Sequence, residues 1–398
     1  MTSQRSRLRI ALVGAGRRGA GAHLPVIPRL DDVYELVAIC DRDEATANRY
    51  AAELGVRAYT SVRELVRHET LDAADVVVPV DAHHAICLFL MERGVHVLVE
   101  TPIAPTLALA DLMIEGARRH DVKLEVAENY YRAPLERLKA RAVDAGLIGE
   151  VSRLYRIFYE GGYHGMSILR THARGAPVSI LGVGHTSPVV SITDRMRRHH
   201  TRERWSMAVV DFDNGVMAIQ MYSNVIHARS LGRGQTGISQ IDGTTGAIVD
   251  DAFHVVPPER LHDGARSTPS RPERVTRHQD GVEVLEALRL PGTDVVWENP
   301  LARYALAERH VAVADELLSL ARAIRENAEP EYGAARARLD QEMNLAMLES
   351  GELDRQAIRF PLTAPTSSEQ AIHARFREQY GCDAEDVDRL LDVFFPRV

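Results

Sequence analysis

A glycine-rich turn near the N-terminus has the residue types and spacing needed to bind a pyrophosphate. The apolar run Leu8–Val13 leads directly into Gly14-Ala15-Gly16-Arg17-Arg18-Gly19, a G-x-G-x-x-G pattern between an expected strand and an expected helix. The first glycine permits the tight turn, the second lets the backbone approach the pyrophosphate, and the third lets the helix pack on the strand. The helix N-terminus adds free N–H groups and the positive end of its dipole. This segment therefore predicts a dinucleotide-binding site.

An acidic residue at the end of the second apolar run supports this interpretation. Asp41 lies 22 residues after Gly19, where a carboxylate accepts hydrogen bonds from the adenosine ribose hydroxyls. A carboxylate repels the 2′-phosphate of NADP, so Asp41 favours NAD as the cofactor. Arg42, together with Arg17 and Arg18, could neutralise that phosphate, which leaves NADP as an alternative. Asp41 could also cap the helix expected over residues 44–54.

Composition and charge exclude several other classes of function. The 398 residues carry 48 Lys and Arg against 56 Asp and Glu, a net charge of −8, whereas nucleic-acid binding needs a concentrated basic face. Three cysteines, an odd number, lie far apart at Cys40, Cys87 and Cys382. They predict reduced thiols and a cytoplasmic protein, with neither disulfides nor a zinc site. No apolar run reaches the roughly 18 residues of a membrane span. We expect no metal site, because the histidine pairs at 83–84 and 199–200 lack suitably spaced Cys or acidic partners.

The first 130 residues alternate between two patterns that predict a doubly wound α/β domain. Apolar β-branched runs predict strands at residues 8–13, 36–40, 76–80, 95–99 and 123–126. Stretches with helical spacing lie at 44–54, 61–68 and 106–120. Apolar strands that alternate with helices are typical of a Rossmann parallel sheet covered on both faces. Residues 1–130 are therefore expected to form the dinucleotide-binding domain.

After Pro134 the pattern predicts an α+β domain over residues 131–365, with a large open, mostly antiparallel sheet. A helix is expected over 135–145 and a strand over 151–159, followed by hairpins within 207–222 and 237–249 that turn through Asn-Gly or Gly-rich links. Two long helices, 301–324 and 333–349, should close the core, and residues 266–278 should form an exposed loop. Residues 366–398 are expected to form a helical tail.

Four further motifs are spread in order over the chain. They are Asp75-Val76-Val77-Val78-Pro79 with His83, then Gly94 to Pro102, Val126-Ala127-Glu128-Asn129, and Ile241-Asp242-Gly243-Thr244-Thr245-Gly246. With these motifs, residues 7 to about 362 resemble the Gfo/Idh/MocA family of nicotinamide-dependent oxidoreductases. The resemblance implies a Rossmann domain followed by a substrate-binding and oligomerisation domain.

The resemblance also implies residue roles. In the family's pattern a Pro and a His four residues later border the nicotinamide half of the cofactor, and they match Pro79 and His83. The next strand ends in an E-K-P triplet, whose Glu matches Glu100. A polar residue after the following strand matches Asn129. The triplet lysine, which helps position the nicotinamide and assists proton transfer, is replaced by Thr101, which can hydrogen-bond but cannot act as a cation.

A second departure concerns the family's usual Asp and His, one helical turn apart. The His matches His185, but the Asp position holds Leu181. His185 could still be the general acid or base, or it could be a structural histidine. The glycine-flanked pair Tyr163 and His164 could replace the missing groups, or could belong to a surface loop.

A third set of residues could bind the substrate. Arg170, His172 and Arg174 would favour a carboxylate or phosphate if they line the pocket, but they could also form a solvated loop. Tyr131, beside Tyr130 and Arg132, could wall the cleft.

The sequence favours an NAD(P)-dependent oxidoreductase that moves hydride between the nicotinamide and a carbon of a sugar, cyclitol or related polyhydroxy compound. Two alternatives remain open. One is a redox-neutral enzyme that recycles NAD during epimerisation or elimination, and the other is a non-catalytic NAD-binding sensor. The resemblance implies a homodimer or homotetramer, with no nucleic acid or membrane partner.

Overall fold

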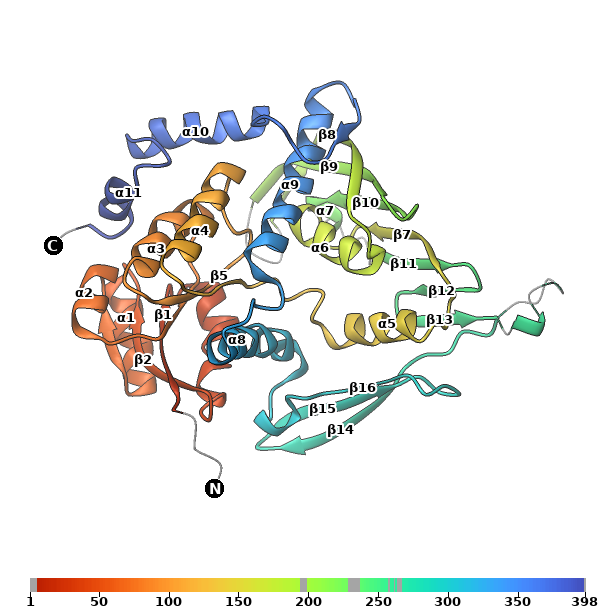
Figure 1. Ribbon diagram of the computed structural model, residues 1–398, viewed down its shortest axis with the longest axis horizontal. Helices are drawn as coiled ribbons and strands as arrows, with labels where there is room; N and C mark the ends of the chain where they lie inside the picture. Colours follow the sequence, from red (N-terminus) through yellow and green to blue (C-terminus); the bar gives the residue numbers. More distant parts are fainter. Residues whose placement is uncertain are drawn as a thin grey trace.

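A six-stranded parallel sheet forms the N-terminal part of the molecule (Figure 1). The computed structural model describes residues 6–193, 199–227, 237–256, 258–260, 262 and 267–396. The sheet has the order β3-β2-β1-β4-β5-β6, from the strands Leu8–Val13 (β1), Tyr34–Cys40 (β2), Arg57–Tyr59 (β3), Ala73–Val76 (β4), His96–Val99 (β5) and Leu124–Val126 (β6). The order reverses at β1, so a crevice opens at the carboxyl ends of β1 and β4, where such sheets bind ligands. The doubly wound fold is confirmed.

Helices cover both faces of this sheet, because its strands are apolar on both faces. One face packs on α2 (Val62–His68), α3 (His83–Met91) and α4 (Leu107–Arg119). The other packs on α1 (Glu44–Leu54), on the turns η1 (Gly19–His23) and η2 (Ile27–Arg29), and on α8 (Glu308–Glu326) from much later in the chain. The two halves of the chain therefore share one core.

A mixed eight-stranded sheet forms the second part, with the order β13-β12-β11-β7-β10-β9-β8-β17. Its strands are Val151–Ile157 (β7), Pro177–Thr193 (β8), His199–Phe212 (β9), Met217–Ser223 (β10), Ile238–Gly243 (β11), Gly246–Val249 (β12), Ala252–Val255 (β13) and Ile358–Arg359 (β17). Among the described strands of this sheet only β7 and β10 pair in parallel, so the large, mostly antiparallel sheet is confirmed.

Three helices cover one face of this sheet, whereas the other face is left open (Figure 1). They are α5 (Pro134–Asp144), α6 (Gly162–Ala173) and α9 (Gly333–Glu352). On the helix side Leu154, Ala218 and Val210 are fully or almost fully buried, whereas their neighbours on the open side are half-buried or exposed. A separate three-stranded sheet consists of Glu273–Gln279 (β14), Val282–Arg289 (β15) and Val296–Glu298 (β16).

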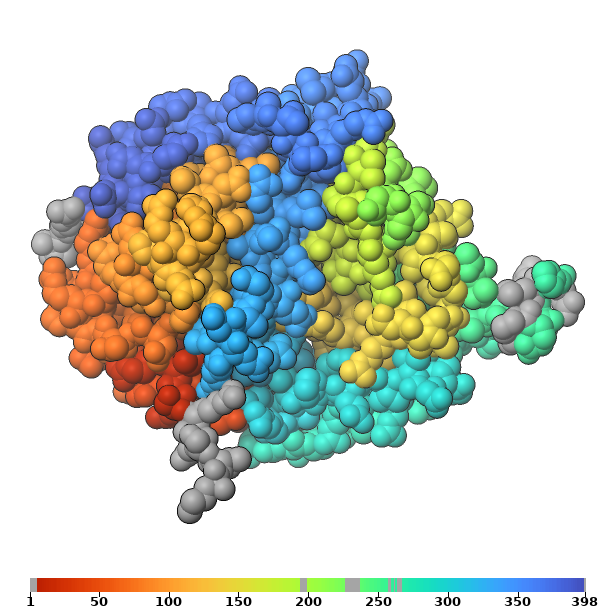
Figure 2. Space-filling view, in the orientation of Figure 1, coloured from red at the N-terminus to blue at the C-terminus, as the bar shows by residue number. Residues whose placement is uncertain are grey.

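The C-terminal segment, residues 366–396, folds back onto the N-terminal domain. It holds α10 (Ser367–Tyr380) and α11 (Val387–Phe394), which lie beside α3 and α4 in Figure 1 and cover part of that domain in Figure 2. Phe376, Leu390 and Leu391 are buried in the same core as α3 and α4. The segment is helical as expected, and it is part of the domain core.

Several element predictions need correction. The segment that carries Leu181 and His185 was expected to be helical, with the two positions one helical turn apart. It is strand β8, because its residues pair along almost their whole length with β9. Residues 273–278 of the expected loop form strand β14, and Arg266 lies outside the described residues. The expected helix over 301–324 begins only at Glu308, after a short 3-10 turn over Ala302–Tyr304. Within the described ranges, no helix is long and apolar enough to span a membrane.

Candidate active site

The glycine-rich turn has the geometry that its sequence predicts. Gly14 has φ +99°, and a Cβ on it would lie 2.1 Å from the carbonyl oxygen of Val77. A Cβ on Gly19 would lie 2.2 Å from the carbonyl oxygen of Gly14. Around Gly16 no atom lies within 4 Å of the added Cβ, so its backbone faces open space. The turn therefore has a bare backbone cradle that fits a pyrophosphate.

Asp41 joins the end of β2 to this turn. Its Oδ2 accepts a hydrogen bond from the Ala15 N–H at 2.8 Å, and its Oδ1 accepts one from the Asp43 N–H at 2.9 Å. The cap of α1 is Asp43, whose carboxylate accepts the Thr46 N–H at 2.7 Å, so Asp41 is not the cap. A carboxylate has about four acceptor sites, which leaves capacity for ribose hydroxyls.

A cavity of about 640 Å³ lies over the turn and Asp41. Its lining comes from the turn, the end of β2, the end of β4, the start of α3 and the C-terminal segment: Gly14, Gly16, Asp41, Arg42, Asp43, Thr46, Val77, Val78, Pro79, Ala82, Ile86, Gln379, Tyr380, Val393, Phe394 and Phe395. We call it the cofactor cavity. Arg17 is exposed on the turn but does not line this cavity.

His83 lies beneath this cavity and does not line it. It is buried, and its ring nitrogens lie 2.9 Å from the Val78 carbonyl oxygen and 3.0 Å from the Pro102 carbonyl oxygen. Burial lowers the pKa of His83, so the ring is neutral at pH 7. As a neutral ring with one N–H, His83 donates to one of these carbonyl oxygens and packs against the other, so it lies between the loops after β4 and β5.

A buried ionic network lies behind the turn. His23 contacts Asp75 at 2.8 Å and Glu100 at 3.0 Å, and Glu100 pairs with Arg18 at 2.5 Å. Burial alone would lower the pKa of His23, but the two carboxylates raise it to about 10, so the imidazole is protonated. His23 and Arg18 outweigh the effect of burial on Glu100 and hold its pKa well below its usual range.

In this network a cation contacts the same carboxylate as Thr101, the residue that replaces the E-K-P lysine. The Thr101 hydroxyl donates to Glu100 Oε2 at 3.3 Å, and Glu100 Oε1 holds the guanidinium of Arg18. Arg18 thus contacts a carboxylate, whereas the sequence suggested a phosphate-binding role.

The clearest acid–base arrangement joins the end of β6 to the start of α6. His164 Nδ1 lies 2.7 Å from Oε2 of Glu128, whose side chain is fully buried. Glu128 Oε1 accepts the Tyr130 N–H at 3.0 Å, and the rings of Tyr130 and His164 lie 4.4 Å apart. Burial opposes protonation of His164, but Glu128 raises its pKa. A buried carboxylate that orients an imidazole is a common arrangement for proton transfer.

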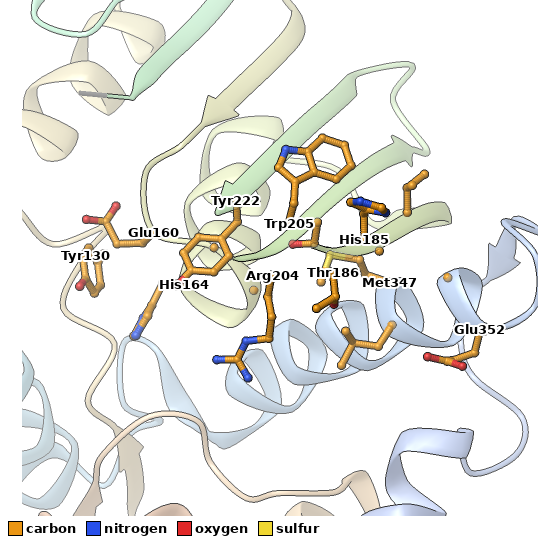
Figure 3. Close-up of a pocket in the computed structure, with 17 residues that line it drawn as sticks. Tyr130, Glu160, His164, His185, Thr186, Arg204, Trp205, Tyr222, Met347 and Glu352 are labelled. Atoms are coloured by element: carbon orange, nitrogen blue, oxygen red, sulfur yellow. The ribbon is translucent and has the colours of Figure 1, made fainter. Parts of the chain in front are cut away.

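A second cavity, of about 660 Å³, opens beside His164 (Figure 3). It is lined by the start of α6, by β8, β9 and β10, and by the C-terminal part of α9: Tyr130, Glu160, Gly161, Gly162, His164, Val183, Gly184, His185, Thr186, Arg204, Trp205, Ser206, Tyr222, Met347, Leu348, Gly351 and Glu352. We call it the substrate cavity. Arg204 extends toward the His164 side (Figure 3), and no ion pair of its side chain is found among the described residues.

His185 lies at the rim of this cavity and is exposed. It pairs with Trp205, whereas its neighbour Thr186 pairs with Arg204, so the two pairs face opposite sides of the sheet. Figure 3 shows His185 and Trp205 on the side away from Arg204 and His164. Leu181 is half-buried on the open face of the sheet, opposite Val209.

The residues suggested for anion binding do not line the substrate cavity. Arg170 pairs with Asp340 at 2.7 and 2.8 Å, and His172 lies 2.8 Å from Glu136. These contacts hold α6 against α9 and α5. Arg174 pairs with Asp144 at the end of α6.

Two tyrosines also lie in the core. Tyr131 stacks on Tyr332 at 5.6 Å, and the buried Tyr163 accepts a hydrogen bond from Tyr332. Burial raises the pKa of Tyr163 well above its usual value, so it is neutral. Asn129 is half-buried between Glu128 and Tyr130.

Sequence reasoning missed Glu128 and Arg204 as site residues, whereas Tyr130 was expected only as part of the cleft wall. Glu128 directly precedes Asn129 after a buried strand, so its place at the carboxyl end of the sheet was a usable signal. Arg204 lies in a strand rich in charged residues, and nothing in the local sequence separates it from Arg202. No cluster of possible metal ligands is found in the part of the chain that the structure describes.

Comparison with known proteins agrees with this geometry. A model of an oxidoreductase family with an NAD-binding Rossmann fold, GFO_IDH_MocA, matches residues 8–128. D-apiose dehydrogenase of Paraburkholderia graminis is 30% identical over 149 residues, which are 37% of this chain and 39% of that protein. The alpha-N-acetylgalactosaminidase of Shewanella oneidensis is 29% identical over 154 residues, 36% of this chain and 33% of that protein. The chain thus matches well under half the length of these curated relatives.

The second domain is related at the level of fold. The crystal structure of an Agrobacterium radiobacter oxidoreductase in complex with NAD+, L-tartaric acid and magnesium has a TM-score of 0.65 at 19% identity, and the match covers 89% of this chain and 98% of that one. The fold and the glycine-rich turn together define the class of protein: it has an NAD-binding Rossmann domain followed by a second domain. Over residues 8–128, the chain is similar to the NAD-binding domain of the Gfo/Idh/MocA family of oxidoreductases.

Proposed function

We propose that the protein is an NAD(P)-dependent oxidoreductase that moves hydride between the nicotinamide and a hydroxyl-bearing carbon of a sugar, cyclitol or related polyhydroxy compound. The observation that carries the proposal is the Glu128–His164 pair at 2.7 Å, directly after β6 and at the edge of the substrate cavity. The likeness to D-apiose dehydrogenase supports the substrate class.

The chain's own residues supply binding and proton transfer. The bare cradle at Gly14 and Gly16 would hold the pyrophosphate, and Asp41 the ribose. When bound, the nicotinamide supplies or accepts the hydride. Glu128 holds Nδ1 of His164, which would leave Nε2 to take or give the proton of a substrate hydroxyl. Thr101, bonded to Glu100, helps fix the loop after β5.

Arg204 would select the substrate within this class. Its guanidinium lies on the cavity side of β9 and has no carboxylate partner among the residues that the structure describes. Arginine binds carboxylate and phosphate groups through two parallel hydrogen bonds. A polyhydroxy acid or a sugar phosphate therefore fits the substrate cavity better than an uncharged polyol.

A pair of histidine variants tests the proposal. Polyols, sugar acids and sugar phosphates are screened with NAD and NADP by following NADH or NADPH absorbance. His164→Asn should lower kcat by roughly 100-fold or more, because general acid–base catalysis contributes about 10²–10⁴. His185→Asn, a matched change at the cavity rim, should keep kcat within about threefold. Loss of activity in His185→Asn alone would overturn the assignment of His164.

A redox-neutral reaction is a second candidate, because the chain is also similar to an alpha-N-acetylgalactosaminidase. In such a reaction the hydride would leave one sugar carbon and later return to the sugar, with His164 handling the protons. The measurement is product formation from nitrophenyl glycosides with catalytic NAD. Product without net NADH supports this candidate, whereas stoichiometric NADH excludes it.

We also propose that the protein assembles as a homodimer or homotetramer in the cytoplasm. The open face of the eight-stranded sheet carries half-buried apolar side chains, among them Tyr155, Val209 and Ile219 in one row across three strands. A second copy of this face would cover them. Cys40, Cys87 and Cys382 are buried and unpaired, as a reducing compartment requires.

A further inference from the structure

The C-terminal segment is fastened to the loop that borders the cofactor cavity. Asp81 follows this cavity's Pro79 by two residues, and it accepts hydrogen bonds from Arg375 at 2.7 Å and from the Tyr380 hydroxyl at 2.8 Å. His84 Nε2 lies 2.7 Å from the Ala384 carbonyl oxygen. These contacts join residues that are about 300 positions apart in the sequence.

Buried apolar side chains add to this attachment. Phe376 and Leu390 are fully buried against α3, and the Phe376 ring lies 6.0 Å from the ring of His84. Arg63 pairs with Asp392 of α11 at 3.1 Å. The segment is therefore held in one position relative to the Rossmann sheet.

Five of the 16 residues that line the cofactor cavity come from this segment. They are Gln379, Tyr380, Val393, Phe394 and Phe395. The ring centroids of Tyr380 and Phe394 are 5.3 Å apart, with an angle of 67° between the ring planes. The remaining lining is the glycine turn, the end of β2 with Asp41, the start of α1, the loop after β4 and the start of α3. Two aromatic rings thus share a cavity with the carboxylate expected to hold the adenosine ribose.

Adenine is the part of a dinucleotide that this arrangement suits. The base is flat and aromatic, and aromatic side chains bind such bases through their π faces. A ribose held at Asp41 would place the base in the same cavity, and the nicotinamide half would then extend toward the carboxyl ends of the neighbouring strands.

We propose that the C-terminal segment is an adenosine clasp, which closes the cofactor cavity over the bound dinucleotide through Phe394 and Tyr380 and slows its release. This rests on the NAD-binding assignment and extends it to residues outside the Rossmann motif. The segment's docking and cofactor binding are then coupled, because the aromatic lining exists only while α10 and α11 are docked on α3.

Binding to the purified full-length protein tests the clasp without any need for turnover. Phe394→Leu keeps the apolar packing but removes the π face. Its affinity for NAD and for ADP-ribose, measured by calorimetry, should fall by about tenfold or more, while its affinity for nicotinamide mononucleotide should not change. Stopped-flow measurement should show faster NAD release. The control, Glu378→Gln, alters an exposed residue of α10 outside the lining and should bind like the wild type.

A second variant tests the coupling. Arg375→Ala removes a contact to Asp81 without changing the lining, and it should also speed NAD release and increase hydrogen exchange in α11. Unchanged NAD and ADP-ribose binding in Phe394→Leu overturns the clasp. Tighter binding also overturns it, because the segment would then obstruct the cavity. Failure of the wild type to bind NAD at all overturns the cofactor assignment itself, so the two failures are distinguishable.

Discussion

At the scale of single residues, the site depends on ionisable groups whose protonation is set by their neighbours. Glu128 and His164 come from different domains, and the fully buried carboxylate stabilises the imidazolium. Arg18, His23 and Glu100 form a second cluster below the turn. Both clusters balance buried charges, because an unpaired charge in the interior would be very costly.

Glu128 should control the pH dependence of the reaction. Because the carboxylate raises the pKa of His164, Glu128→Gln should lower it toward the ordinary value. Substrate oxidation needs a neutral imidazole as the base, so the acid limb of its pH profile should move to lower pH in the variant. The kcat should also fall, because Nε2 loses its orientation. Measured pH profiles that superimpose would contradict this role of Glu128.

His23 should make stability depend on pH. Its pKa is raised to about 10 from an unfolded value near 6.5, so the native state binds a proton that the unfolded state has lost between these values. Its contribution is complete below pH 6.5 and should be lost as the pH rises to about 10. Urea unfolding of His23→Gln should show a flatter profile over that range and a loss of about 3 kcal/mol at pH 7.

Glu316 provides the control for His23, because it is a buried neighbour of the same cluster. Burial raises its pKa well above the usual value, so the carboxyl is already neutral in the folded protein. Glu316→Gln should therefore be at least as stable as the wild type at pH 7. A loss as large as that of His23→Gln would show that packing, not charge, dominates the cluster.

At the scale of elements, strands and turns present the bare backbone and the reactive side chains. The turn after β1 needs glycine for two separate reasons, a positive φ at Gly14 and the close contact at Gly19. The segment directly after strand β6 carries Glu128 and Tyr130, while the start of α6 carries His164. The C-terminal segment adds a wall that no Rossmann element supplies.

Two alanine substitutions should separate stability from cofactor binding in the turn. In Gly14→Ala the new residue must adopt a positive φ, and its Cβ clashes with the Val77 carbonyl oxygen. The substitution should therefore lower the free energy of unfolding by about 2 kcal/mol or more. Gly16→Ala has open space around the new methyl group and should unfold like the wild type. It should nevertheless weaken NAD binding by about tenfold or more, because the methyl lies where the pyrophosphate approaches. Thermal unfolding and calorimetry measure the two effects.

At the scale of the whole molecule, the two domains share one core, and one sheet face is left open. Helix α8 follows the second domain in the chain but packs on the Rossmann sheet, and α10 and α11 return to that domain. Both cavities are therefore completed by segments that are distant in the sequence. The open sheet face is the surface expected to hold a second copy.

A charge on the open face should disrupt assembly. Ile219→Arg places a guanidinium in the middle of the row formed with Tyr155 and Val209, so it should convert an oligomer into a monomer. Sedimentation velocity over a range of concentrations measures the change. Leu112→Arg, which puts the same charge at an exposed apolar position of α4, should leave the assembly intact. A wild type that remains monomeric at high concentration would refute the proposed interface.

The sequence by itself determined the features whose parts are adjacent in the chain. The glycine turn, Asp41 at the end of β2, the alternating strands and helices and the hairpin of β9 and β10 all follow from local spacing. Local patterns are sufficient here because backbone geometry and burial on one element impose them. The cofactor half of the site was therefore largely predictable, and the fold class with it.

Tertiary structure alone decided which side chains meet. The stretch around His185 is apolar and rich in glycine, so only its pairing with β9 made it a strand and turned the ring away from His164. Arg170 and His172 instead contact Asp340 and Glu136, which lie on other helices. The docking of Phe394 over the cofactor cavity joins the two ends of the chain. Such contacts depend on the burial and pairing of groups far apart in sequence, which no local pattern records.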